Sequence, residues 1–402
     1  MGPFTVDVSS RRLLRNGSEL DLRPRTFDVL LLLIRNSGRC VSYDEMIRAG
    51  WGGVSVARHT VAVTVAELKT ALGEFGDWIR CRSKVGYALE VPESADLIRL
   101  GWHFWSLHTR EGFEKALECF QRAQQDGAEA RAWEGMAACY IMLSTFGLRP
   151  PQESYAAFLD AHSRVVALTG LTPELRAERA RGLHLIERRF AEAECELRQA
   201  LAERPGLAIG YTHLMLVYGT SGRLDEAVKT LEQGYRADAL SLSLRTTEVL
   251  IRLWRREFHE AVLCGKKAVE LYPGAPLCRS VHAQALEYSG KFDEALTELK
   301  LARMMAPDIP LLQSLGGRYL AKTGKREEAR AILHDLQRLR QSEYVDPYAI
   351  ALLQHALGNV EDAFHELDAA FHEGSPTAFL FEGEPEAGHL RATARLSQLR
   401  AS

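Results

Sequence analysis

Three absences limit what this chain of 402 residues can be. The longest wholly apolar run is residues 29–34, whereas a helix needs roughly 20 apolar residues to cross a bilayer. No basic segment followed by an apolar one opens the chain, as a signal peptide would. The seven cysteines stand singly, without a Cys-x-x-Cys pair, which is typical of a reducing compartment. Together these features predict a cytoplasmic protein with no membrane anchor.

The usual motifs of catalysis are also missing. The sequence contains no G-x-x-x-x-G-K-[ST] phosphate loop, no G-x-G-x-x-G fingerprint, no H-E-x-x-H and no G-x-S-x-G elbow. Carboxylate pairs such as Glu327 and Glu328 lie where helices are expected to begin, which favours a role at the helix end over acid–base chemistry. We therefore expect no enzyme activity, no metal and no cofactor.

Neither sign of charge is in large excess, but the net charge differs between the two ends of the chain. The net charge is -3. Residues 1–93 carry 13 Lys and Arg against 11 Asp and Glu, and the remainder carries 37 against 42. The resulting +2 and −5 are compatible with an N-terminal segment that binds nucleic acid, although they do not require it.

The most regular feature is an alanine that recurs every 34 residues. One or two acidic residues stand directly before it in each case, within closely similar strings. The positions are Ala193, Ala227, Ala261, Ala295, Ala329 and Ala363.

Each period has the composition of two antiparallel helices that pack closely. A small side chain lets the helices approach, a glycine such as Gly222 ends the first helix, and a proline such as Pro273 ends the second. A 34-residue helical period resembles tetratricopeptide repeats. The unit ending near Ser342 departs from the pattern because Leu336 replaces its second small residue.

Further units precede these. Ala116 lies in a matching string, but it is 77 residues before Ala193, nine more than two periods. An insertion near 145–173 is expected as a loop on one face, either a longer connection or a binding lip. Residues 96–402 are thus predicted to form an all-α superhelix of about eight helix pairs.

The first helices of such units line a concave face, where a peptide or protein partner would bind. For each side chain, packing or solvated surface is the alternative role. The candidates are His213, Leu216, Thr246, Leu250, Trp254, Ser280, Gln284, Tyr288, Arg318 and Tyr348.

The first 95 residues follow a different pattern. Residues 4–8 alternate as a strand, and Asn16-Gly17 is a hairpin turn signal. A helix opens at Pro24, and Ser42-x-x-Glu45 is a capping box that begins another. A third helix is predicted over about 56–72, followed by a β-hairpin with basic residues at alternate positions.

These strings resemble the OmpR/PhoB-type DNA-binding domain over nearly all of residues 3–91, which implies an α+β winged helix-turn-helix domain over 1–95. With the repeats, the chain is similar to the CadC-like and HilA-like transcriptional regulators. The matching strings are Leu22-x-Pro24-x-x-Phe27-Asp28-Val29-Leu30, Gly38-Arg39-x-Val41-Ser42, Trp51, Arg58-x-Thr60-Val61, Leu68-Lys69-x-x-Leu72-Gly73 and Val85-Gly86-Tyr87.

The resemblance implies a recognition helix at about 57–71 in the major groove and a hairpin, the wing, against the neighbouring backbone. Glu67 departs from the family pattern. The departure matters because a carboxylate in the groove must face cytosine amino groups or be repelled by phosphate. The implied phosphate contacts are Arg58, Lys69, Arg80, Arg82 and Lys84, and the implied base contacts are His59, Thr60 and Thr64.

Two hypotheses follow. In the first, the chain is a sequence-specific DNA-binding transcriptional regulator. Its partners are double-stranded promoter DNA, a protein or effector in the repeat groove, RNA polymerase, and a second copy of the chain as a homodimer. In the second, it is a scaffold or adaptor whose winged helix serves protein contacts. The basic hairpin favours the first, and Glu67 with the near-neutral domain favours the second.

Overall fold

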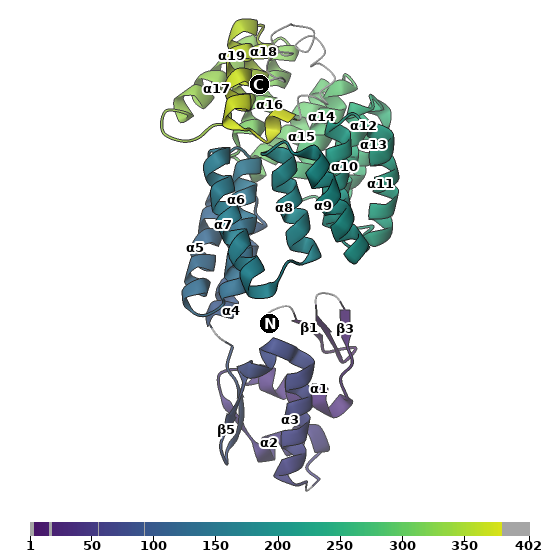
Figure 1. Cartoon of the computed structure of the whole chain (residues 1–402), viewed down its shortest axis with the longest axis vertical. Coiled ribbons are helices and arrows are strands. Elements are labelled where there is room, and N and C mark those ends of the chain that lie inside the picture. The colour runs from purple at the N-terminus through teal and green to yellow at the C-terminus, as the bar shows by residue number, and fades with distance from the viewer. Residues whose placement is uncertain (1–3, 16–17, 55, 92, 380–402) are drawn as a thin grey trace. The chain divides into compact units, whose positions relative to one another are not determined.

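The computed structural model consists of two compact units (Figure 1). Of the described residues, those up to 101 together with 119–129 form an N-terminal unit, and the others form a helical unit, so the first helical pair is divided between them. The expected boundary at residue 95 stays a prediction, and the Asn16-Gly17 turn lies outside the described residues. The structure describes residues 4–15, 18–54, 56–91 and 93–379.

Up to residue 91, the described part of the N-terminal unit has two small antiparallel sheets, three α-helices and one 3-10 helix. One sheet has the strand order β1-β2-β3 and the other has the order β4-β6-β5. The elements are β1 (Phe4–Asp7), β2 (Arg12–Arg15), β3 (Ser18–Leu20), α1 (Pro24–Arg35), β4 (Cys40–Ser42), α2 (Tyr43–Trp51), α3 (Arg58–Leu72), the 3-10 helix η1 (Gly73–Trp78), β5 (Ile79–Arg82) and β6 (Gly86–Leu89).

Local sequence explains how α2 begins. The Ser42 side chain accepts a hydrogen bond from the Glu45 backbone, and the Glu45 carboxylate accepts one from the Ser42 backbone. The capping box is therefore confirmed, and it satisfies two amide groups that would otherwise lack partners. The Arg39 guanidinium and the bond from Ser42 lower the pKa of Glu45 to about 2, which keeps its carboxylate charged.

The wing requires glycine at the first residue of β6. Gly86 pairs with Ser42 of β4 and with Arg82 of β5. A Cβ atom at Gly86 would lie 1.9 Å from the backbone oxygen of Val41. No side chain fits in that space, so only glycine allows the hairpin to join β4 in one sheet.

The helical unit continues as paired helices, and the eight pairs expected from the sequence are confirmed in the described part of the chain. The pairs are α4 (Glu93–Trp105) with α5 (Arg110–Gln125), α6 (Glu129–Thr145) with α7 (Pro151–Thr169), α8 (Pro173–Leu185) with α9 (Phe190–Glu203), α10 (Ala208–Thr220) with α11 (Leu224–Ala237), α12 (Leu242–Trp254) with α13 (Phe258–Leu271), α14 (Pro276–Tyr288) with α15 (Phe292–Met305), α16 (Pro310–Lys322) with α17 (Arg326–Leu339), and α18 (Pro347–Ala356) with α19 (Val360–Glu373).

The recurring alanines are all buried early in the second helix of a pair, at 0% exposure except Ala363 at 3%. Their small size allows the two helices of a pair to pack closely, as the period predicts. Leu336, the departure from the pattern, is also fully buried and packs with Val345, Ile350 and Leu353. A larger side chain therefore fills the corresponding space in that unit.

The turn inside each pair has a left-handed backbone, whether or not glycine is present. A non-glycine residue in this conformation costs about 1 kcal/mol or more. The turn geometry therefore belongs to the repeat, and glycine only makes it easier to form. The positive φ angles are 76° at Gly222, 76° at Gly290, 86° at Gly324 and 82° at Gly358, and they are 60° at Arg188 and 62° at Arg256, which stand at the same repeat position.

The insertion expected as a loop is mostly helix. Helix α6 has 17 residues and α7 has 19. The corresponding helices from α8 to α17 have 13 or 14. The loop prediction for 145–173 was therefore wrong, because Pro150 and Pro151 begin a long helix where they were expected to mark a bend. The connection between the two helices covers only residues 146–150.

Within the helical unit, early and late repeats touch each other. The Arg110 side chain, at the start of α5, donates to the backbone oxygens of Leu148 (2.8 Å) and Tyr344 (3.4 Å) and pairs with Glu343 (3.2 Å). Its backbone N–H donates to the Asp308 carboxylate. One arginine thus joins α5 to the connections after α6, α15 and α17.

Two more contacts lie along the same junction. The buried Asp346 carboxylate accepts a hydrogen bond from Ser375 (2.7 Å), and a Cβ atom at Gly147 would lie 2.6 Å from Asp346. The Arg188 guanidinium donates to the Phe371 backbone oxygen (3.0 Å) and lies 5.1 Å from that ring's centre. The end of the superhelix therefore packs against α6 to α8.

Within the part of the chain that the structure describes, no helix has both the length and the apolar character that crossing a membrane requires. All seven cysteines are free thiols.

Two histidines are enclosed inside the helical unit. His184 contacts the Thr220 hydroxyl at 2.8 Å, and burial lowers its pKa to about 3. Burial and the nearby Arg181 also lower the pKa of His213, neither of whose ring nitrogens has a hydrogen-bond partner. Both imidazoles are therefore neutral in the folded protein at pH 7.

These buried histidines predict that acid destabilises the helical unit. Below pH 6.5 the unfolded chain binds protons that folded His184 and His213 do not bind, so the free energy of unfolding falls as the pH falls. The expected slope is about 1.4 kcal/mol per pH unit for each histidine. Urea unfolding of the full chain between pH 7 and pH 5, followed by circular dichroism, measures it.

The variant His184→Gln removes one of the histidines whose pKa is lowered by burial, so its stability should change less steeply with pH. The exposed His259 provides the control, because His259→Gln should leave the slope unchanged. Equal slopes in His184→Gln and the unchanged chain would contradict the assignment.

Candidate nucleic-acid interface

Helix α3 has a buried face and an exposed face. Val61, Val65, Leu68 and Leu72 are at most 2% exposed and pack in the core of the N-terminal unit. At 3.6 residues per turn, the opposite face carries residues spaced by three, four, seven and eleven. That outer face consists of His59, Ala62, Val63, Ala66 and Thr70.

The start of α3 presents two of the three predicted base-contacting residues to solvent. His59 is exposed, and Thr60 is half-buried. The prediction that Thr64 contacts bases was wrong. Thr64 is only 8% exposed, and its hydroxyl donates to the Thr60 backbone oxygen at 3.1 Å. A threonine within a helix often bonds to the carbonyl four residues earlier. Thr64 is buried because it lies about 100° around the helix from Val63, on the flank that turns toward the core.

The predicted cations are exposed at the edges of this surface. Arg58 is exposed and Lys69 is half-buried, both on α3. Arg80 and Arg82 alternate along β5 as predicted, but Lys84 lies in the turn after it, with φ at 64°. Lys84 is exposed there, but it does not continue the alternation of Arg80 and Arg82 along the strand. Figure 1 shows α3 and β5 in the N-terminal unit.

Aromatic contacts connect the start of α3 to the wing. The Arg58 guanidinium lies 5.2 Å from the centre of the Tyr43 ring. That ring meets Tyr87 of β6 edge-on, with 5.9 Å between the ring centres. Burial, together with Tyr43, raises the pKa of Tyr87 to about 12, so it stays neutral. These contacts hold a cation of α3 in a defined position beside the hairpin.

Glu67 has a counter-charge that the sequence did not reveal. The Arg23 guanidinium, just before α1, donates to its carboxylate at 2.9 Å, and the Thr26 hydroxyl lies at 3.5 Å. The carboxylate is therefore drawn toward the start of α1 and partly neutralised. Arg23 and Glu67 are 44 residues apart, so only the packing of α1 against α3 brings them together.

Comparison with known proteins agrees with this arrangement. Residues 17–89 match the family described as "Transcriptional regulatory protein, C terminal". Over 96 residues the chain is 33% identical to the transcriptional activator CadC of Escherichia coli (strain K12), which covers 23% of this chain and 19% of CadC. Over 70 residues it is 31% identical to the transcriptional regulatory protein KdpE of Mycobacterium tuberculosis (strain ATCC 25618 / H37Rv), which covers 17% of this chain and 31% of KdpE.

The N-terminal unit is a winged helix of the OmpR/PhoB type. It is a DNA-binding domain of transcriptional regulators, with α2 and α3 as the helix-turn-helix and β5 and β6 as the wing. The chain spans about a fifth of CadC and a third of KdpE, so this likeness concerns the winged helix alone.

The helical unit has the tetratricopeptide architecture that its period predicts. The chain resembles the structure of a human IFIT1 dimer with m7Gppp-AAAA at 17% identity and a TM-score of 0.51. That match covers 85% of this chain and 84% of the other. At this identity the likeness concerns the fold alone.

Five of the ten side chains predicted to line the concave groove of the repeats are buried. Thr246 and Tyr348 are at most 4% exposed, and the equally buried Arg318 pairs with Glu287, which also accepts from Lys322 at 2.7 Å. These side chains belong to the interior, as His213 does. Part of the surface remains accessible at Trp254, Gln284 and Tyr288.

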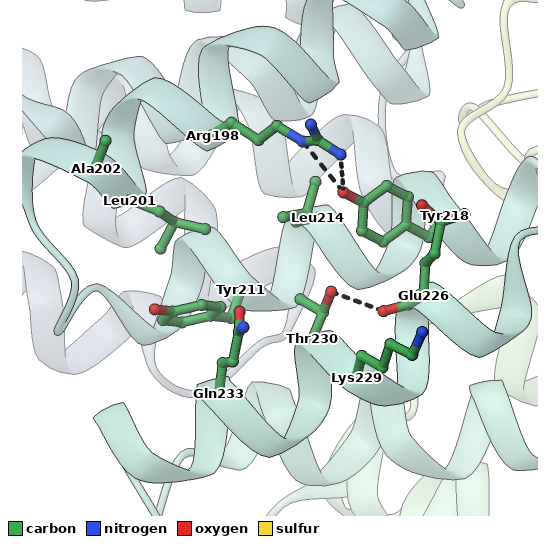
Figure 2. A pocket seen from close by; sticks show the side chains of 10 residues that line it. All are labelled: Arg198, Leu201, Ala202, Tyr211, Leu214, Tyr218, Glu226, Lys229, Thr230 and Gln233. Atoms are coloured by element: carbon green, nitrogen blue, oxygen red, sulfur yellow. Dashed lines mark hydrogen bonds between the residues drawn. The ribbon is translucent and has the colours of Figure 1, made fainter.

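A groove that the sequence did not indicate lies between α9, α10 and α11. Its volume is about 410 Å³. Figure 2 shows the Arg198 guanidinium donating to the Tyr218 hydroxyl, and the Thr230 hydroxyl donating to the Glu226 backbone oxygen. The residues that line this groove are Arg198, Leu201, Ala202, Tyr211, Leu214, Tyr218, Glu226, Lys229, Thr230 and Gln233.

The ion pair between Arg23 and Glu67 should reduce the repulsion between the Glu67 carboxylate and DNA phosphates. The variant Arg23→Ala leaves the Glu67 carboxylate without its partner, so DNA binding should weaken roughly twofold to fivefold, the range for an exposed pair. In a Glu67→Gln background the same change should cost much less. Fluorescence-anisotropy titration of the full chain with labelled duplex DNA measures both.

Arg12 provides a matched control, because it forms another exposed ion pair in the same unit, with Glu19 at 3.5 Å. Arg12→Ala should change binding equally in both backgrounds. If Arg23→Ala also had the same effect in the unchanged chain and in the Glu67→Gln background, the ion pair would not be what shields the carboxylate.

Proposed function

We propose that the chain is a sequence-specific transcriptional regulator that binds double-stranded promoter DNA through its winged helix. Helix α3 lies in the major groove, and the wing contacts the neighbouring backbone. The observation that carries this proposal is an exposed α3 face with cations at its edge and on the wing, in a domain of the regulator family.

The charged and uncharged parts of this surface have different roles. Arg58 and Lys69 on α3, with Arg80, Arg82 and Lys84 on the wing, contact phosphates and set affinity and register. Arg82 also pairs with Glu90 in the free protein, so it exchanges one partner for another on binding and contributes less than Arg80. His59 and Thr60, at the start of α3, reach base edges.

The repeats bind a protein partner or effector. Because half of the side chains predicted to line the concave face are buried, the open groove between α9 and α11 is the better candidate surface (Figure 2). Tyr211 and Tyr218 on α10, with Arg198 and Lys229 at the sides, suit a peptide that carries both apolar and acidic groups. A second copy of the chain and RNA polymerase are further candidate partners.

One observation favours the adaptor alternative. The outer face of α3 carries no charge, and Val63 at its centre is 44% exposed, as in a surface that binds an apolar protein partner. The cations beside that face and the family of the domain make DNA the better-supported partner.

The wing cations provide a direct test. The variant Arg80→Ala/Arg82→Ala/Lys84→Ala should weaken DNA binding across all sequences. It should also lower the slope of log affinity against log salt by roughly 2 to 3, since each lost phosphate contact removes about one released counterion. Anisotropy titrations of the full chain at several salt concentrations measure the slope.

The control removes three exposed cations of the repeats, in Lys266→Ala/Lys267→Ala/Lys300→Ala, and should leave the slope unchanged. An unchanged slope in the wing variant would remove the wing from the interface. The absence of any DNA binding by the folded full chain would favour the adaptor function.

A further inference from the structure

The centre of the outer face of α3 cannot form hydrogen bonds through its side chains. Ala62, Val63 and Ala66 occupy three neighbouring positions there, between His59 at one end and Thr70 at the other. Val63 is 44% exposed and Ala66 is also exposed. The helix is therefore apolar on its solvent side as well as on its core side.

The polar groups of this part of α3 are directed elsewhere. The Thr64 hydroxyl bonds to the backbone oxygen of Thr60, and the Glu67 carboxylate is held by Arg23. Lys69 stands at the edge, about 100° around the helix from the centre of the face. A base edge that meets the middle of α3 therefore meets methyl groups.

The largest apolar group on the base edges of the major groove is the C5-methyl group of thymine. We propose that α3 reads thymine through these methyl groups, with Val63 as the main specificity-determining residue and Ala62 and Ala66 leaving the space for close approach. This inference rests on the proposed function, because it assigns what the DNA interface recognises. It predicts thymine where Val63 meets the bases.

The charges around this face favour DNA over an apolar protein surface as its occupant. Arg58 lies at one edge and is connected through Tyr43 and Tyr87 to the wing that carries Arg80. An apolar strip bordered by cations matches a thymine-bearing groove bordered by phosphates. An apolar protein partner would leave these cations without counter-charges.

The test begins by selecting duplexes that the full chain binds from a random DNA pool. Each thymine of a selected duplex is then replaced by deoxyuridine, which keeps the base pair and removes only the methyl group. At one or two positions binding should weaken about fourfold, the factor expected for losing one buried methyl-sized group.

The variant Val63→Ser removes the methyl groups that form the contact, so the loss at those positions should fall to less than twofold. Val8→Ser provides the matched control, since Val8 is 50% exposed and lies in the turn between β1 and β2, outside α3. That variant should retain the full preference for thymine over uracil. Circular dichroism checks that both variants are folded.

The outcomes separate this inference from the function on which it rests. Selective DNA binding that is insensitive to deoxyuridine, or equally sensitive in Val63→Ser, would overturn the reading of methyl groups and leave the regulator function standing. Failure of the folded chain to bind any DNA would overturn both. A protein contact that Val63→Ser abolishes while DNA binding is unaffected would reassign this face to a protein partner.

Discussion

The burial of one side of α3 determines what the winged helix can do. Val61, Val65, Leu68 and Leu72 pack against the core with almost no exposed surface, so the helix cannot rotate without losing several kcal/mol of apolar burial. That constraint selects the residues that face outward, turns Thr64 inward and brings Glu67 within reach of Arg23. The proposed DNA interface is therefore largely a consequence of how this helix packs.

Much of the fold could be predicted because its signals are local or periodic. An alanine every 34 residues is visible without any knowledge of contacts, and it predicted six helix pairs. The matching string around Ala116 extended the prediction to about eight. The capping box at Ser42 and Glu45 needs only four consecutive residues. Helix α3 runs from Arg58 to Leu72, close to the expected 56–72, because the spacing of its apolar residues specifies both its extent and its buried side.

The missed features depend on contacts between distant segments or on the competition between side chains and backbone. The pair of Arg23 with Glu67 exists only because α1 packs on α3. Thr64 was expected to contact bases because of its residue type, but it lies on the flank of α3 that packs toward the core, and its hydroxyl bonds to its own helix. The repeat register identified residues of the first helices, but it did not show how tightly the superhelix is wound, so Arg318 and Tyr348 were expected at an open surface and are buried. The prolines at 150 and 151 begin a helix as readily as they mark a bend.

The contact between early and late repeats changes how this part of the molecule should unfold. In an open array each repeat touches only its neighbours, so unfolding can start at an end and spread step by step. Here Arg110 of α5 has acceptors after α6 and α17, and Asp346 lies against Gly147. Unfolding the last pair would remove Asp346 from Gly147 and take the Phe371 backbone oxygen away from the Arg188 guanidinium, so fraying at either end carries an additional cost. The superhelix is therefore expected to open as a single cooperative unit, in which the repeats most distant in sequence protect one another.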